Sequence, residues 1–132
     1  MYYYKSKIKL YSKGSSTPQE KYYARVFRGF NVSLDEIAKE ISHATSVSYP
    51  DVVAALKAFE IHVSNHILNG NAVFFESLGA FIPRLRSQAL DNKDDVNADS
   101  IKKVTCRFLP SVAFKQNLKG VSFEEKVLPT SV

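Results

Sequence analysis

One stretch, Leu68–Phe81 with the sequence LNGNAVFFESLGAF, constrains the fold of this 132-residue chain more than any other. It begins with Asn69-Gly70, a pair that ends helices because it supplies the left-handed conformation of a C-cap. Two apolar runs follow, separated by a tight corner at Gly79. The stretch therefore predicts the end of a helix and then two strands, Ala72–Glu76 and Ala80–Arg86, that meet at a glycine whose backbone conformation or surroundings exclude a Cβ.

Two helices are predicted before this stretch. Ser33 and Glu36 have the spacing of a capping box, which marks the start of the first helix. Ser48 caps the second, with Pro50 in its first turn, where a missing N–H costs nothing. The second helix carries a long apolar stripe that ends at Leu68. Two short helices cannot cover this stripe, so the sequence predicts that a partner surface packs against it.

The chain after the two strands is predicted to return and end in a helix. Gln88–Asp99 is polar and rich in Asp and Asn, which indicates an irregular excursion. Ile101–Phe108 is the returning strand, and Val112–Lys119 is the last helix, capped by Ser111 and followed by Gly120. Residues 121–132 are predicted to form a tail.

A separate hairpin is predicted at the N-terminus. Tyr4–Tyr11 alternates lysines with less polar residues, so we expect a strand with Lys5, Lys7 and Lys9 on a solvated face and Ile8 and Leu10 on a dry one. Turn-forming residues follow, and then a second strand over Lys21–Phe30. The predicted organisation is an extension over residues 1–32, a domain over 33–120 and a tail over 121–132.

Charge is concentrated in the first quarter of the chain. Residues 1–33 contain seven Lys and Arg against Glu20 alone, whereas the other 99 residues contain 11 basic and 12 acidic side chains. A concentrated basic segment attracts polyanions, although a solubilising surface has the same composition. The single cysteine excludes an internal disulfide, no apolar run is long enough for a membrane helix, and the start lacks a signal-peptide pattern. We therefore expect a cytoplasmic protein.

The order of these elements resembles the HU/IHF family of histone-like DNA-binding proteins, specifically HU-like variants with an extra N-terminal β segment. The resemblance is carried by Leu68–Phe81 and by Phe108–Lys119, FLPSVAFKQNLK, and covers residues 33–120. It implies an α+β, IHF-like fold in which two protomers intertwine and project hairpin arms that embrace DNA in the minor groove.

The resemblance also implies a set of DNA-binding residues. The arm would rise through Arg84 and Arg86, turn within Gln88–Asp99 and descend on the returning strand; the expected contacts are Arg84, Arg86, Lys102, Lys103, Arg107, Lys115 and Lys119. Alternation of side chains places Arg84 with Arg86 and Lys103 with Arg107, a pattern that suits a phosphate clamp and also suits edge strands protected against aggregation. Lys115 and Lys119 either contact phosphate or complement the end of their helix. Lys5, Lys7 and Lys9 form a possible secondary basic face.

The arm departs from the family pattern at its tip. The family carries a Gly-x-Lys-Asn-Pro-x-Thr-like stretch whose proline wedges between base steps. Residues 88–100 contain no proline and four aspartates, so phosphates should repel this tip. The last helix also starts with Pro110-Ser111-Val112 in place of the family's Pro-Gly-Lys.

Signals for an enzyme or a metal site are weak. His62 and His66 have a chelating i, i+4 spacing, but the metalloprotease glutamate is missing, and surface histidines explain them more simply. Cys106 alternates in phase with Val104 and Phe108, so we expect a small buried apolar residue. Asp91–Asp99 lacks the glycine and glutamate of a calcium loop. We predict no catalytic residue, metal, cofactor or small-molecule substrate.

Aromatic residues crowd the basic N-terminal segment. They interleave with lysine and arginine, as in platforms on which single-stranded nucleic acid stacks, but tyrosines in strands more commonly pack across a sheet. Together with the charge pattern, the resemblance to the HU/IHF family implies a homodimer that binds double-stranded DNA through its backbone, with little sequence preference, in the nucleoid. The alternative is a dimeric structural or protein-interaction module that kept the fold and lost its affinity for DNA.

Overall fold

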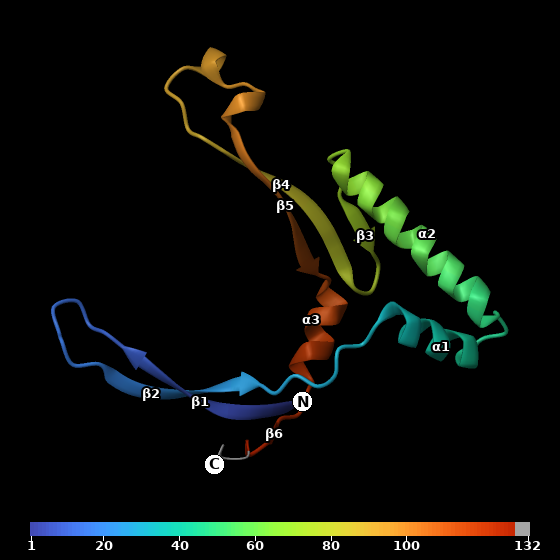
Figure 1. Ribbon diagram of the computed structural model, residues 1–132, viewed down its shortest axis with the longest axis horizontal. Coiled ribbons are helices and arrows are strands. Elements are labelled where there is room, and N and C mark those ends of the chain that lie inside the picture. Colours follow the sequence, from blue (N-terminus) through green and yellow to red (C-terminus); the bar gives the residue numbers. More distant parts are fainter. Residues whose placement is uncertain (129–132) are drawn as a thin grey trace. The chain divides into compact units, whose positions relative to one another are not determined.

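The computed structural model describes residues 1–128, which form two compact units (Figure 1). One unit comprises residues 1–31 together with the described chain from 120 onward. The other comprises residues 32–119. With three helices and two three-stranded sheets, the chain has an α+β fold, as the sequence predicts.

The smaller unit is a sheet of β1 (Tyr2–Leu10), β2 (Gln19–Val26) and β6 (Glu124–Glu125). β1 lies in the middle, antiparallel to β2 and parallel to β6. The predicted hairpin is present, but both strands begin two residues earlier than expected, and β2 ends four residues earlier. β2 ends early because its pairing reaches the first residue of β1, where the Phe27 N–H donates to the Tyr2 carbonyl at 2.8 Å.

The larger unit contains α1 (Leu34–Ala44), α2 (Tyr49–Leu68), β3 (Val73–Phe75), β4 (Gly79–Ser87), β5 (Ile101–Pro110) and α3 (Val112–Lys119). β4 lies between β3 and β5, and both pairings are antiparallel. α2 packs against α1 and against β3 and β4. The predicted caps are confirmed: Ser33 and Glu36 form a complete capping box, and the Ser48 side chain accepts from Asp51 N–H. Gly70, just past α2, has φ +85°.

The corner at Gly79 is also confirmed. This glycine has φ +143°, and a Cβ added there would lie 2.1 Å from the carbonyl oxygen of Leu109 on β5. Only a residue without a side chain allows the two strands to approach so closely. The corner also anchors α3, because Ser111 N–H donates to the Leu78 carbonyl at 2.9 Å and Ser111 Oγ donates to the Ser77 carbonyl at 2.8 Å.

The core of the protomer is small. Among the described residues the buried apolar side chains are Ala38, Val52 and Ala80, and no large side chain is fully buried. Four phenylalanines form a chain from α2 across the sheet, with ring centroids 5.6, 5.7 and 5.4 Å apart: Phe59, Phe75, Phe81 and Phe108. Phe59 is nevertheless 48% exposed. The apolar stripe of α2 is therefore only partly covered within one chain.

Several predictions about local structure are wrong. Cys106 is exposed, because it lies on an open groove that this face of β5 forms with α2. Ile8 and Leu10 are also exposed, since the sheet that contains them has no apolar layer within its own unit. Gln88–Asp99 is ordered: it contains the 3-10 turns Lys93–Asp95 and Ala98–Ser100.

The region expected to be a tail contains β6, a strand of two residues that is too short to produce a periodic signal in the sequence. Its Glu124 N–H donates to the Met1 carbonyl at 3.1 Å and Lys126 N–H donates to the Tyr3 carbonyl at 2.7 Å. The last part of the predicted tail, residues 129–132, lies outside the described residues.

Candidate nucleic-acid interface

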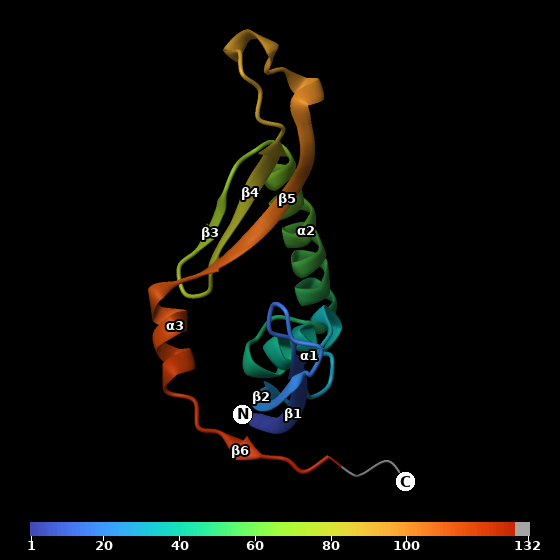
Figure 2. The same ribbon diagram turned by 90° about the vertical axis from the view of Figure 1, so that its left-hand side faces the viewer.

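The hairpin formed by β4 and β5 is a projecting arm. Figures 1 and 2 show that it continues past the ends of β3 and α2, so its outer half has no neighbouring strand or helix within the larger unit. Pro83 lies beyond the last residue of β4 that pairs with β3, a position where a strand tolerates a missing N–H. The arm therefore presents both faces of a two-stranded ribbon.

The strand register gives these two faces opposite character. Arg86 pairs with Lys103, Arg84 with Thr105 and Ile82 with Arg107. Because directly paired residues in an antiparallel ribbon point to the same side, one face carries four cations: Arg84, Arg86, Lys103 and Arg107. We call this set the cationic face. Strand geometry spaces Arg84 and Arg86 by about 7 Å, and Lys103 and Arg107 by about 13 Å.

The opposite face of the arm is apolar. It pairs Phe81 with Phe108, Pro83 with Cys106 and Leu85 with Val104. Leu85 and Val104 are 66% and 65% exposed, a high value for two apolar side chains that face each other. This face continues toward α2, where Phe81 and Cys106 line a groove of about 590 Å³ together with Leu56, Phe59, Val63, Ile67 and Leu68.

Lys102 lies apart from the cationic face. The register shifts between Arg86 and Ser87, so that Ser87 pairs with Ile101 and Lys102 occupies the irregular position. The sequence pattern could not show this shift, because an irregularity in pairing depends on the partner strand.

The arm tip is a closed and acidic structure. Gln88 N–H donates to the Ser100 carbonyl at 2.9 Å, and the Ser87 hydroxyl donates to the same oxygen at 3.2 Å. Asn97 caps the second turn by accepting from Asp99 N–H at 2.9 Å. The tip contains four aspartates and Lys93, and it holds no proline that could act as a wedge. Sequence reasoning identified the charge of the tip but missed the Ser87–Ser100 closure.

Lys115 and Lys119 are exposed on α3 and lie one turn apart, which places them on one side of the helix. Their helix starts at the corner of the sheet, where Ser111 Oγ also accepts from Phe114 N–H at 3.0 Å. Both lysines are thus fixed to the larger unit, the unit that carries the arm.

The secondary basic face is partly neutralised. Lys5 Nζ lies 3.0 Å from a carboxylate oxygen of Glu125, and Lys7 Nζ lies 2.7 Å from one of Glu20. The pKa of Lys5 is raised, chiefly by its hydrogen bond to Glu125, and the pKa of Lys7 is raised chiefly by its hydrogen bond to Glu20. Sequence alone could not reveal the first pair, because it depends on β6.

Within residues 1–128 no group of three or more His, Cys, Asp or Glu side chains is close enough to hold a metal ion. None of the helices in the same residues is long and apolar enough to cross a membrane.

Comparison with known proteins agrees with this architecture. A family described as "HU domain fused to wHTH, Ig, or Glycine-rich motif" matches residues 3–125. The fold and the arm define an HU-like domain. Because the match covers nearly the whole chain, the chain belongs to this HU-HIG family.

A solved structure has the same fold. It is a crystal structure of a protein from Bacteroides vulgatus ATCC 8482 that is assigned as a bacterial DNA-binding protein. The TM-score is 0.60 at 10% sequence identity, over 94% of this chain. This chain spans 47% of that protein's length. Comparison with curated proteins gives no match.

Proposed function

We propose that this protein binds double-stranded DNA through the sugar-phosphate backbone, as a homodimer whose arms lie along the duplex. One observation carries the proposal: the register of β4 and β5 gathers Arg84, Arg86, Lys103 and Arg107 on one face of a projecting hairpin. Such a ribbon can follow a groove and place cations near phosphates. Lys115 and Lys119 on α3, and Lys102 beside the shift in register, would add contacts to the same polyanion.

The proposed contacts carry little base information. Lysine and arginine on phosphates release counterions, so binding should depend steeply on salt and only weakly on sequence. The acidic tip supports backbone binding without a wedge, because residues 88–100 would have to enter the negative field of the grooves to separate base steps. We expect weak affinity, with Kd of about 10⁻⁴ to 10⁻⁶ M at physiological salt.

The proposal of an intertwined, IHF-like dimer is supported by the uncovered apolar surface of the larger unit. The groove beside α2 and the apolar face of the arm form a surface that would stabilise the fold by about 25 cal/mol for each Å² buried. A second copy offers the same surface, as the twofold symmetry of a homodimer requires.

Within this proposal residues 33–120 are the DNA-binding domain, residues 1–32 are an appended hairpin and residues 121–132 follow as a C-terminal segment. The function is architectural and not enzymatic, it needs no cofactor or small molecule, and its place is the cytoplasmic nucleoid.

The experiment that tests the proposal is a titration of a fluorescent duplex of about 30 base pairs at several salt concentrations. The variant combines Arg84→Gln with Arg86→Gln, which removes two positive charges from the cationic face. Each phosphate interaction that these substitutions remove should reduce the magnitude of the log–log salt slope by about 0.9, so the slope of the double variant should be smaller by about 1.8. The matched control is Lys13→Gln with Lys57→Gln, which removes the same charge from exposed residues outside the arm.

Two results would contradict the proposal. Equal weakening by the arm variant and the control would show that net charge governs binding and that the arm has no special part. Absence of duplex binding by the wild type at low salt would favour the alternative, a dimeric interaction module without affinity for DNA.

A further inference from the structure

The sheet of the smaller unit has two faces that differ in charge pairing. Directly paired residues share a face, so Tyr4 and Arg25 lie on one side, and Lys7 and Tyr22 lie on the other. The side of Lys7 also carries Lys5 and Glu125, which form an ion pair. We call this side the lysine face and the other side the aromatic–cation face.

The aromatic–cation face consists of rings in contact with cations. The Lys126 ammonium lies 4.5 Å from the ring centroid of Phe27 and 5.3 Å from that of Tyr2. The Arg25 guanidinium lies 5.0 Å from the ring centroid of Tyr23. The face is defined by these residues and the neighbouring Tyr4: Tyr2, Tyr4, Tyr23, Arg25, Phe27 and Lys126.

The cations of this face keep their charge available. Within residues 1–128, Arg25 and Lys126 form no ion pair with a carboxylate, whereas Lys5 and Lys7 on the lysine face both do. Lys21 pairs with Ile8 and so shares the face with Arg25, and Glu124 is the acidic residue there. The N-terminal excess of positive charge is thus least compensated where the rings gather.

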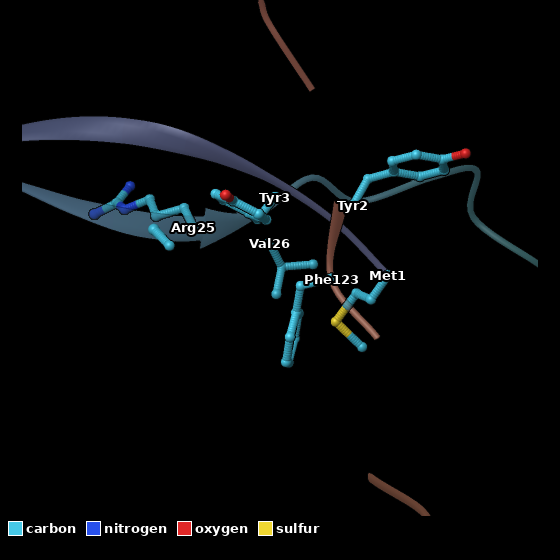
Figure 3. Close-up of a pocket in the computed structure, with 7 residues that line it drawn as sticks. Met1, Tyr2, Tyr3, Arg25, Val26 and Phe123 are labelled. Atoms are coloured by element: carbon cyan, nitrogen blue, oxygen red, sulfur yellow. The ribbon is translucent and has the colours of Figure 1, made fainter. Parts of the chain in front are cut away.

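The rings of Tyr23 and Phe27 are half-buried, and a cation lies over each of them. A cation within about 6 Å of a centroid can lie over the ring face, so one face of each ring is covered by a flexible charged side chain that can move away. Figure 3 shows a pocket of the smaller unit, lined by Met1, Val26 and Phe123 together with Tyr2 and Arg25 of the aromatic–cation face. This pocket therefore adjoins the aromatic–cation face and shares two residues with it.

From this arrangement we propose that the aromatic–cation face binds single-stranded nucleic acid. Bases would stack on Tyr23 and its neighbours, and Arg25 and Lys126 would turn from the rings to phosphates. Every base has a π-face, so such binding tolerates any sequence. The bases of a duplex are paired and stacked on one another, so they cannot stack on these rings. This face would therefore bind a different substrate from the cationic face of the arm. The proposal does not depend on the arm.

The test uses the full chain and a fluorescent oligo(dT) of roughly 20 nucleotides, longer than typical single-strand sites. Tyr23→Ser should weaken binding about 5-fold or more, the equivalent of one stacked base. Arg25→Gln should weaken binding and reduce the magnitude of the log–log salt slope by about 0.7, the value for one phosphate contact on a single strand. Tyr23→Phe keeps the ring and should bind within about 2-fold of wild type. Tyr22→Ser is the matched control, because Tyr22 directly precedes Tyr23 and lies on the lysine face. The same titration with oligo(U) shows whether the face binds RNA or DNA more tightly.

A fluorescent reporter provides a second measurement of binding, in case a variant that loses binding has also failed to fold. The chain contains no tryptophan, so Tyr23→Trp and Tyr22→Trp each introduce a single probe. Oligo(dT) should quench the probe at position 23 and leave that at position 22 unchanged. The proposal is overturned if the wild type binds no oligonucleotide at low salt, if both probes respond equally, or if polyglutamate competes as well as oligo(dT), which would indicate an acidic protein partner.

Discussion

Arg86 and Lys103 lie directly opposite each other in the β4–β5 hairpin, two like charges at a position where opposite charges would stabilise the pair. Like charges directly opposite each other destabilise a hairpin. A repulsive pair that persists on a projecting ribbon is consistent with an anionic ligand, since a phosphate between the two cations would remove the repulsion.

We therefore expect Lys103→Gln to have opposite effects on stability and binding. The free energy of unfolding should rise by a few tenths of a kcal/mol, and affinity for duplex DNA should fall with a salt slope smaller by about 0.9. Urea denaturation and fluorescence anisotropy measure the two quantities. A variant that loses both stability and binding would show that Lys103 supports the hairpin structurally.

The corner at Gly79 gives a prediction about stability alone. Gly79→Ala should destabilise the fold by roughly 3 kcal/mol or more, because the new Cβ would meet the Leu109 carbonyl and the backbone would be strained. Gly70→Ala separates these two causes, since Gly70 also has positive φ but open space around it. That control should cost only about 1–2 kcal/mol in thermal denaturation. Equal destabilisation of the two variants would mean that β4 and β5 can move apart without penalty.

Dimerisation should make stability depend on concentration. If a second copy covers the groove beside α2, the Tm should rise with protein concentration, and Phe59→Asp should yield an unfolded or monomeric chain. His62→Asp places the same charge three residues along α2 on an exposed residue outside the groove lining. It should sediment as the wild-type dimer. A folded wild-type monomer at low micromolar concentration would refute the proposed dimer.

A polar contact between α1 and α2 should make the stability of the fold depend on pH. Tyr49 donates its hydroxyl to the carboxylate of Asp35, and Lys39 Nζ lies 3.2 Å from the same group. The pKa of Asp35 is lowered, first by Tyr49 and then by Lys39, and the pKa of Tyr49 is raised, chiefly by Asp35. The Asp35 contribution is present above its ordinary pKa of 3.8 and disappears as pH falls through the lowered value.

The Tyr49 contribution has the opposite sign, being present below its ordinary pKa of 10.0 and disappearing as pH rises through the raised value. The contact should thus be intact between about pH 4 and pH 10. Tyr49→Phe should move the pKa of Asp35 upward in an NMR titration. An unchanged pKa would show that the Lys39 interaction alone lowers it.

Local signals in the sequence predicted most elements of the larger unit. The capping box at Ser33, the Asn69-Gly70 end of α2 and the Gly79 corner depend on neighbouring residues, and the structure confirms them. β6 was missed because a two-residue strand has no periodicity. Cys106 was predicted wrongly because alternation identifies the face of a strand but not whether another layer covers that face.

In the candidate site, too, the sequence predicted the local features but not those that depend on distant residues. Alternation correctly separated Arg84 and Arg86 from Leu85, but the pairing of Arg86 with Lys103 and the displacement of Lys102 depend on register, which the turn region sets. The ion pair of Lys5 with Glu125 joins residues far apart in the chain, so a count of charges overestimated that lysine face.

The acidic tip should limit DNA affinity by repulsion. Asp91→Asn with Asp94→Asn removes two negative charges, and neither side chain takes part in the side-chain hydrogen bonds of the tip, which involve Ser87, Asn92, Asp95, Asn97 and Ser100. Duplex affinity at low salt should increase several-fold, and the gain should vanish near 1 M salt, where the screening length falls to about 3 Å. The control is Glu40→Gln with Glu76→Gln, which changes net charge equally on exposed residues outside the tip. If the tip aspartates instead hold the arm in a binding geometry, the same variant would bind more weakly at every salt concentration, and the arm would contact DNA by a mechanism other than simple phosphate attraction.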